Sequence, residues 1–165
     1  MKYKFCPLCK SPLKHKKIDT HKRQVCLDCG FIYYQNPTPA AAAIIMIDGK
    51  LVLVKRKYEP FAGLWSLPSG FMEYGESAQE CAARETKEET NLKIKPGPLV
   101  GVYSGIDDPR CHVILVVYQG QAVTRNMVAG DDASQIELFS PKNLPRDIAF
   151  KAHRYAIRDF LAGQK

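Results

Sequence analysis

The sequence of 165 residues has no long hydrophobic run, which limits the classes of protein it can belong to. No stretch approaches the roughly 20 apolar residues that a membrane-spanning helix requires. The opening residues MKYKFCPLCK carry lysines and cysteines in place of the apolar segment of a signal peptide. Internal repeats and low-complexity segments are also absent. We therefore expect a cytoplasmic protein without a membrane partner, with one main domain and at most a small appendage.

Acidic residues are scarce only at the N-terminal end. Residues 1–30 hold eight Lys and Arg against two Asp, whereas residues 31–165 hold sixteen Lys and Arg against fifteen Asp and Glu. The formal charge of +7 thus belongs almost entirely to the first part of the chain. Because basic patches attract phosphate groups, a nucleic-acid partner and a polyphosphate ligand both stay open. The simpler alternative is that these lysines keep a small, surface-rich module in solution.

Four cysteines form two C-x-x-C pairs separated by sixteen residues: Cys6, Cys9, Cys26 and Cys29. Thiolates suit the tetrahedral coordination of Zn²⁺, and the intervening stretch is long enough for a hairpin that brings the second pair back. Two disulfides are the alternative, which the absence of a secretion signal disfavours. Since four thiolates complete the shell, we expect His15 and His21 on the surface. About thirty residues bury too little core alone, so the metal would supply the folding energy.

The segment FIYYQNPTP at residues 31–39 is expected to end this zinc ribbon and to serve as a linker, because aromatic residues are followed by two prolines. We place the domains at 1–36 and 37–165. Gly30 follows the second cysteine pair, where a tight turn favours glycine. The remaining cysteines, Cys81 and Cys111, are expected to be ordinary buried thiols.

The second domain is predicted to be of the α/β class, with a mixed sheet and two helices. Two apolar runs flank Asp48-Gly49, which indicates a hairpin of strands at 41–47 and 51–56. The β-branched run CHVILVVYQG predicts a central strand. Further strands are expected at these positions: 98–104, 111–120 and 135–139.

Two helices are predicted, one with clear end signals. Ser77 and Glu80 form a capping box that starts a helix over 77–90, and Asn91 tolerates the left-handed conformation at its end. The second helix is placed at 148–161 with Asp147 as its cap. Its predicted apolar face consists of five residues: Ile148, Ala152, Tyr155, Ala156 and Phe160.

Three of the four glutamates in the first helix, Glu85, Glu88 and Glu89, have the spacing i, i+3 and i+4. This spacing places them on one face, where like charges repel by a few tenths of a kcal/mol per pair. The face therefore favours a cation, and clustered carboxylates suit Mg²⁺ or Mn²⁺. A bare E-x-x-E-E pattern taken alone is more commonly a solvated acidic face.

The residues around these glutamates resemble the signature of the Nudix hydrolase family, G-x5-E-x7-R-E-U-x-E-E-x-G-U, where U is a bulky aliphatic residue. The matching positions are Gly70, Glu76, Arg84, Glu85, Glu88 and Glu89. Two positions depart. Thr86 stands where an aliphatic residue is usual and is close to valine in shape, and Asn91 replaces the second glycine. Neither departure touches the metal chemistry, so we expect an active enzyme.

The resemblance extends over nearly the whole chain, through the cysteine ribbon, the YQNP linker, the WSLP segment and the NLPRDIAF segment. It is greatest to the zinc-ribbon Nudix pyrophosphatases that act on ADP-ribose or FAD. NADH pyrophosphatases also carry a ribbon, but their SQPW-type element is missing here.

The resemblance implies a Nudix-type α/β/α sandwich that binds Mg²⁺ or Mn²⁺ next to a structural Zn²⁺ ribbon. Glu85 and Glu89 would be direct ligands with Glu88 beside them, completed by the backbone carbonyl at Ser69 or Gly70. A metal-activated water would attack phosphorus. Arg84 would pair with Glu76 or Glu73 and hold the metal glutamates in place. The candidates for the general base are Asp131, Asp132 and Glu137.

Substrate selection is expected to come from residues outside the signature. Arg56, Trp65 and Glu73 are the predicted substrate-binding residues. Arg110 is a further candidate for phosphate, and aromatic rings that would stack on a base or flavin are Trp65, Phe61, Tyr34 and Tyr103. For each ring, packing in the core or on the surface is the competing interpretation.

The expected function is hydrolysis of the diphosphate bond in a nucleotide derivative, with ADP-ribose or FAD as substrate. The alternatives are NADH or NAD-cap hydrolysis, and a nucleic-acid-binding regulator whose Nudix domain senses a ligand. The intact set of glutamates argues against a mere sensor. A homodimer, with the ribbon as an interaction surface, is left open.

Overall fold

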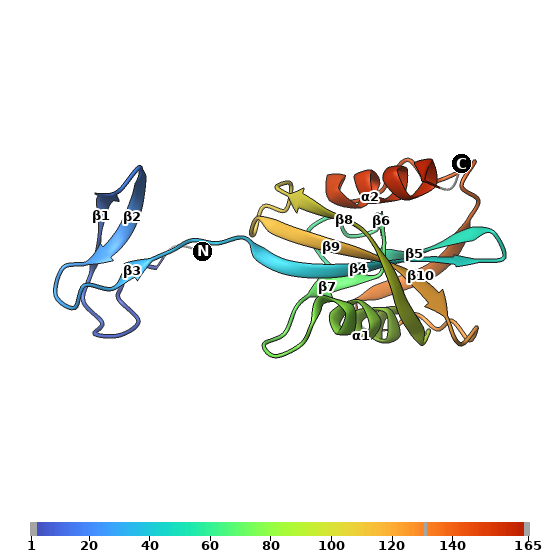
Figure 1. Cartoon of the computed structure of the whole chain (residues 1–165), viewed down its shortest axis with the longest axis horizontal. Coiled ribbons are helices and arrows are strands. Elements are labelled where there is room, and N and C mark those ends of the chain that lie inside the picture. Colours follow the sequence, from blue (N-terminus) through green and yellow to red (C-terminus); the bar gives the residue numbers. More distant parts are fainter. Residues whose placement is uncertain (1–2, 131, 164–165) are drawn as a thin grey trace. The chain divides into compact units, whose positions relative to one another are not determined.

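The computed structural model describes residues 3–130 and 132–163. The chain divides into two compact units, Met1–Pro37 and Thr38–Lys165, each described here by itself (Figure 1). Among the described residues, no helix is long and apolar enough to cross a membrane.

The first unit is a three-stranded antiparallel sheet of β1 (Leu13–Ile18), β2 (His21–Cys26) and β3 (Ile32–Tyr33). Strands β1 and β2 form the hairpin that returns the second cysteine pair, with Leu13 opposite Cys26. His15 and His21 are exposed, in agreement with the prediction. Gly30 has a φ of 77°, a conformation that glycine adopts without strain.

The second unit is built on a mixed sheet with the strand order β10-β5-β4-β9-β8. Neighbours along this path are antiparallel except β4 and β9, which are parallel. Every strand predicted in this unit is present, and each begins or ends slightly beyond its predicted limits: β4 (Thr38–Ile47), β5 (Lys50–Arg56), β8 (Ile94–Gly105), β9 (Val113–Ala122) and β10 (Ala133–Phe139).

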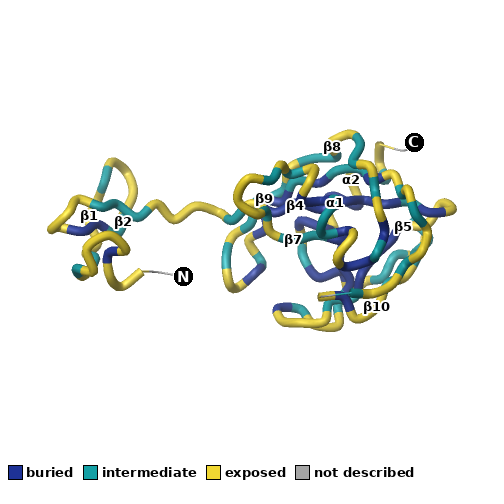
Figure 2. The backbone as a smooth tube through the Cα atoms, turned by 90° about the horizontal axis from the view of Figure 1, so that it is seen from below, coloured by how far each residue is buried: buried dark blue, intermediate teal, exposed yellow. Residues whose placement is uncertain are grey.

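Strand β4 is buried on both faces and separates two hydrophobic cores (Figure 2). Its residues Ala40, Ala42 and Ile44 belong to the core under helix α2 (Lys151–Ala162). The alternate residues 41, 43, 45 and 47 belong to the core under helix α1 (Ala78–Thr90). Because successive side chains of a strand point to opposite faces, one strand serves both cores. The two helices cover opposite faces of the sheet (Figure 1).

Strands β4 and β5 pair only near their hairpin, whose turn residues Asp48 and Gly49 both have positive φ as expected for this connection. Farther along, two short strands take over the pairing. Strand β7 (Ser69–Phe71) lies against β4, and β6 (Trp65–Ser66) lies against β5. Neither strand is predicted from the sequence, because two or three residues are too few for an alternating pattern.

Helix α1 agrees with its predicted end signals. Ser77 accepts a hydrogen bond from the Glu80 N–H, and the Glu80 carboxylate accepts one from the Ser77 N–H. Asn91 ends the helix with a φ of 60°, in the left-handed region. Thr86 is fully buried, and its hydroxyl donates to the Ala82 carbonyl at 2.7 Å, which satisfies the polar atom at a position where the signature has an aliphatic residue.

Helix α2 starts three residues later than predicted, and its predicted cap is wrong. Residues 147–149 are extended, because the Asp147 carbonyl accepts from the Trp65 N–H and the Ala149 N–H donates to the Trp65 carbonyl. The first helical N–H, of Lys151, is bound by the distant Asp107 carboxylate at 2.8 Å.

The predicted apolar face of α2 is also partly wrong. Ile148 is buried but precedes the helix, and Tyr155 is 47% exposed. The buried helical residues are Ala152, His153, Ala156, Ile157 and Phe160. The face is therefore rotated relative to the prediction and includes a histidine.

We predict that Ser77→Ala lowers the free energy of unfolding of the second unit by about 1 kcal/mol, because it removes the side chain that caps α1. Urea unfolding followed by tryptophan fluorescence measures this, since Trp65 is the single tryptophan and lies in the core of that unit. Ser104→Ala, at an exposed strand position, is the control and should unfold at the wild-type midpoint. Equal midpoints for all three proteins would contradict the capping assignment.

Candidate active site

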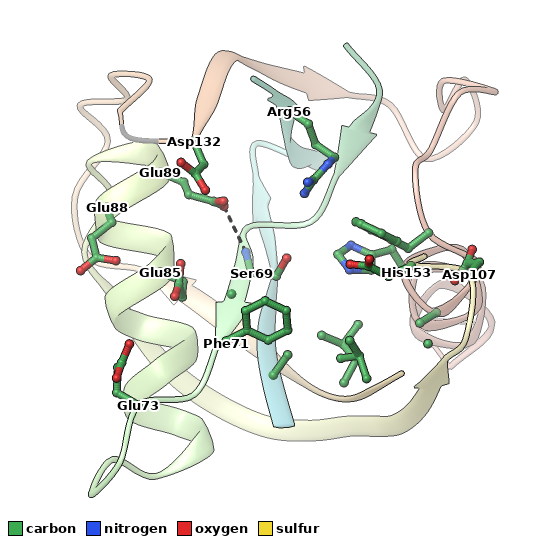
Figure 3. A pocket seen from close by; sticks show the side chains of 18 residues that line it. Arg56, Ser69, Phe71, Glu73, Glu85, Glu88, Glu89, Asp107, Asp132 and His153 are labelled. Atoms are coloured by element: carbon green, nitrogen blue, oxygen red, sulfur yellow. Dashed lines mark hydrogen bonds between the residues drawn. The ribbon is translucent and has the colours of Figure 1, made fainter. Parts of the chain in front are cut away.

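The glutamates of α1 face the short strand β7, whose backbone lies directly against the helix. The Glu89 carboxylate accepts a hydrogen bond from the Ser69 N–H at 3.1 Å, which ties the last turn of α1 to the start of β7 (Figure 3). Cys81, lower on the helix, is buried as predicted and lies within hydrogen-bonding distance of the Gly70 and Phe71 carbonyls. Cys111, in contrast, is only half-buried.

Gly70 is required by this close approach. A Cβ atom at position 70 would lie 2.1 Å from the carboxyl carbon of Glu85, far inside van der Waals contact. The first glycine of the signature therefore leaves the space that the Glu85 carboxylate occupies. Its backbone conformation is not the reason, since only the space beside it is restricted.

Arg84 joins three carboxylates through its guanidinium group. It pairs with Glu76 at 2.7 Å, Glu85 at 2.7 Å and Glu88 at 3.0 Å. Of the two partners that the sequence left open, Glu76 is the one that Arg84 contacts, and this ion pair lowers the pKa of Glu76 to about 2. A further hydrogen bond, which the Arg84 guanidinium donates to the Phe71 carbonyl, connects this side chain to β7. Arg84 thus fixes the helix, its preceding loop and β7 together.

Glu89 is buried and Glu85 is half-buried, in surroundings where a carboxylate is unfavourable without a cation. Burial raises the pKa of Glu89 to about 8, against the opposing effect of the Ser69 hydrogen bond. Burial also raises the pKa of Glu85, against the opposing effect of Arg84. Glu88 is the most exposed of the three, with 42% of its side chain accessible. Hard oxygen donors that line one pocket and are partly desolvated in this way suit a divalent cation such as Mg²⁺ or Mn²⁺.

These side chains border a pocket of about 380 Å³, within the range of small-molecule sites. Glu85, Glu88 and Glu89 line one side, with the backbone of β7 beside them. His153, from α2, lies on the opposite side, and Arg56 projects between the two sides (Figure 3). Phe71 lies between them as part of the lining.

The predicted substrate-binding residues divide into two groups. Arg56 and Glu73 line the pocket. Trp65 does not belong to the described lining: its ring is buried and packs edge-on against Phe139 at 4.8 Å, which corrects the prediction that it contacts substrate. Packing in the core was the competing interpretation for this ring, and the burial of Trp65 agrees with it.

The remaining aromatic and basic candidates lie outside the described lining as well. Tyr34 belongs to the ribbon, where Arg23 stacks over its ring at 4.5 Å. Phe61 packs against Phe150, and the Tyr103 hydroxyl donates to Asp159. Arg110 forms a bidentate pair with the buried Asp108, which itself lines the pocket.

The three candidates for the general base are separated by their positions. Asp132 lines the pocket near Glu89 (Figure 3). Glu137 is exposed on β10 and is not part of the lining described for residues 3–130 and 132–163. Asp131 lies outside the described residues.

Several residues that line the pocket are not predicted from the sequence: Phe71, Asp107, Asp108, Phe150 and His153. The NLPRDIAF segment was noticed only as part of a resemblance, although it ends at Phe150. A histidine on an otherwise apolar helix face was the available signal for His153. A histidine on such a face fits a core position and a ligand site equally well, so the sequence alone does not distinguish the two.

The four ribbon cysteines form a second candidate metal site. Their sulfur atoms all lie within 4.8 Å of one another, with Cys6 and Cys29 at 3.5 Å and Cys9 and Cys26 at 3.4 Å. Tetrahedral Zn–S bonds of about 2.3 Å place sulfur atoms about 3.8 Å apart, so the arrangement fits one zinc ion. The thiols are free rather than paired in disulfides.

Comparison with known protein families agrees with this geometry. A model described as NUDIX domain matches residues 37–160, which contain the whole pocket. The chain belongs to the Nudix family. A second model, a Nudix zinc ribbon described as Nudix N-terminal, matches residues 4–35. The chain is accordingly a Nudix pyrophosphohydrolase with an N-terminal ribbon.

Individual Nudix relatives differ in how much of the chain they match. The ADP-ribose pyrophosphatase of Methanocaldococcus jannaschii is 45% identical over 129 residues, 78% of this chain and 75% of that protein. The NAD-capped RNA hydrolase NudC of Chromobacterium violaceum is 34% identical over 94 residues, 56% of this chain but 34% of its own length. A solved Nudix hydrolase from Nitrosomonas europaea has a TM-score of 0.88 and 30% identity, covering 98% of this chain and 92% of that one.

We predict that Gly70→Ala reduces Mn²⁺ affinity by about 10- to 100-fold, because the new methyl group displaces the Glu85 carboxylate. Titration of Mn²⁺ by electron paramagnetic resonance measures the free ion directly. Gly97→Ala is the matched control, since a Cβ there meets its nearest atom at an ordinary 3.4 Å. Wild-type Mn²⁺ affinity in Gly70→Ala would contradict the role given to Gly70.

We also predict about one zinc per chain by elemental analysis, lost in Cys26→Ala and kept in Cys111→Ser. Loss of zinc should abolish the amide dispersion of the ribbon residues in NMR spectra, because the metal supplies their folding energy. Trp65 fluorescence should stay unchanged, since Trp65 belongs to the other unit. A folded, zinc-free ribbon would overturn the assignment.

Proposed function

We propose that this Nudix enzyme hydrolyses the diphosphate bond of ADP-ribose, with FAD as the second candidate substrate, and that it uses Mg²⁺ or Mn²⁺. The observation that carries the proposal is the convergence of Glu85 and Glu89 on one side of the pocket. These carboxylates would hold the cation beside a bound diphosphate, whose charge it would offset. The similarity to an ADP-ribose pyrophosphatase supports this choice of substrate.

When bound, the divalent ion would neutralise diphosphate charge and acidify the attacking water. Glu85 and Glu89 would hold it, with Glu88 at the outer side. Arg84 would keep Glu85 in place through the ion pair that also engages Glu76. Asp132 lines the pocket, which supports it over Glu137 as the group that takes the proton from water.

Arg56 is the proposed partner for the phosphate oxygens. Its Nε donates to the Pro60 carbonyl at 2.9 Å, and its guanidinium lies 4.9 Å from the centre of the Phe150 ring. These contacts hold the guanidinium group at the pocket. Burial lowers the pKa of Arg56, and the nearby charge of Arg110 lowers it further. A desolvated guanidinium gains more from an anionic ligand than an exposed one does.

A third candidate substrate is an NAD-type cap on RNA. The names of several relatives support it, but this chain spans only a third to a half of their length. The test therefore includes capped RNA, NADH, diadenosine polyphosphates and nucleoside triphosphates beside ADP-ribose and FAD. Products are identified by mass after incubation with Mg²⁺.

We predict that ADP-ribose yields AMP and ribose 5-phosphate, and that Glu89→Gln lowers kcat/KM at least about 100-fold. Glu80→Gln is the control on the same helix, because glutamine also serves the capping box. Absence of hydrolysis for every compound in the panel would refute the enzymatic proposal. A preference for capped RNA would replace the proposed substrate and keep the site.

A further inference from the structure

We propose that His153 is a specificity-determining residue whose Nε2–H donates a hydrogen bond to a neutral acceptor atom of the substrate, outside the diphosphate. The acceptor is a hydroxyl or carbonyl oxygen, or a ring nitrogen, of the ribose or base that flanks the reacting bond. This inference rests on the proposed function, because it assumes a diphosphate bound at the glutamates.

The protonation of the His153 ring follows from one backbone contact. Its Nδ1 lies 3.2 Å from the Leu67 nitrogen, and a backbone N–H can only donate. Nδ1 must therefore be the unprotonated acceptor, which leaves the proton of the neutral ring on Nε2. Burial also lowers the pKa of His153 to about 3, with Arg56 contributing in the same direction, so the ring is neutral at ordinary pH.

The donor is directed toward ligand space. His153 is only 5% exposed, yet it lines the pocket, on the side opposite Glu89 (Figure 3). Among the described residues, Nδ1 has a hydrogen-bond partner and Nε2 has none. Nε2 is not one of the buried unpartnered atoms, so it reaches the accessible space of the pocket, where a ligand acceptor can receive its hydrogen bond.

The charges around His153 favour a neutral acceptor over a phosphate. Asp107 lines the pocket together with it, and a carboxylate repels a phosphate at close range, whereas the charge of Asp108 is offset by its ion pair with Arg110. Arg56, the cation suited to phosphate, projects between His153 and the glutamates (Figure 3). The diphosphate would therefore lie near Arg56 and Glu89, and His153 would meet the group next to it. Phe150, with its ring 5.2 Å from His153, adds an apolar contact for a sugar or base.

Two substitutions separate the two nitrogens of the ring. The side-chain oxygen of asparagine lies two bonds from Cβ, as Nδ1 does, so His153→Asn can still accept from Leu67 while it lacks the Nε2 donor. The amide nitrogen of glutamine lies three bonds from Cβ, as Nε2 does. His153→Gln therefore keeps the donor and leaves the Leu67 N–H without its acceptor.

The expected effects on activity and stability run in opposite directions. His153→Asn should lower kcat/KM for ADP-ribose about 10- to 100-fold with the smaller loss of stability. His153→Gln should stay within a few-fold of wild type in kcat/KM while it lowers the urea midpoint more. Trp65 fluorescence verifies that each variant is folded. If the asparagine variant keeps wild-type kcat/KM, or both variants lose activity equally, the donor role is wrong.

Substrate analogues locate the acceptor. The asparagine penalty is measured on ADP-ribose and on three analogues: the methyl ester of ADP, which lacks the terminal ribose; CDP-ribose, which lacks the purine; and the 2′,3′-dideoxyadenosine form. The penalty should disappear for the one analogue that lacks the contacted group, which identifies ribose or base. The same penalty on all four compounds would place the contact at the diphosphate or make it purely structural, and would overturn the inference.

Long-range ¹H–¹⁵N NMR of the histidine rings gives a readout independent of turnover. The His153 signal, assigned by its loss in His153→Asn, should show a protonated Nε2 and an unprotonated Nδ1, with the Nε2 shift changing when ADP-ribose binds. The opposite tautomer would refute the proposal. If the wild-type protein hydrolyses no diphosphate at all, the proposed function is wrong. If the wild type is active and His153→Asn has the same kcat/KM, only the role given to His153 is wrong.

Discussion

The close contact between β7 and α1 is the constraint on which the rest of the site depends. Two buried carboxylates, Glu85 and Glu89, are held against a backbone that offers one N–H, from Ser69, and no side chain at Gly70. Like charges in this position repel, and only the surrounding contacts keep them together. The loop before the helix and the helix itself are therefore one unit, locked by Arg84 through Glu76 and the Phe71 carbonyl.

The opposite side of the pocket is held by longer-range contacts. Asp107 binds the first N–H of α2 at Lys151, and the extended residues before the helix pair with Trp65. The Leu67 N–H then orients His153 from the strand side. The start of α2 and the ring of His153 are consequently positioned by β6, by Leu67 after it and by the loop that follows β8, rather than by signals within the helix.

This difference explains what the sequence could predict. The capping box, the glutamate spacing and the end of α1 at Asn91 are local patterns, and all three are present as expected. The start of α2, the burial of Trp65 and the participation of His153 depend on partners 44 to 86 residues away. Periodicity carries no information about such contacts. The sites on the glutamate helix were therefore predicted from residues, whereas the facing side emerged only from the tertiary arrangement.

Strand β4 pairs with β5 near their hairpin and with β7 farther along. The two sides of the pocket are therefore connected to different strands, one to β4 and the other to β5. Strand β7, which contacts the glutamates of the proposed metal site, pairs with β4, while β6, next to the residues that precede α2, pairs with β5. We therefore expect substitutions in α2 to disturb the contact between β7 and α1 less than substitutions within that contact do. This separation lets ligand preference diverge during evolution while the hydrolytic residues on the other side are inherited without change. It also makes α2 the natural target for redesigning selectivity.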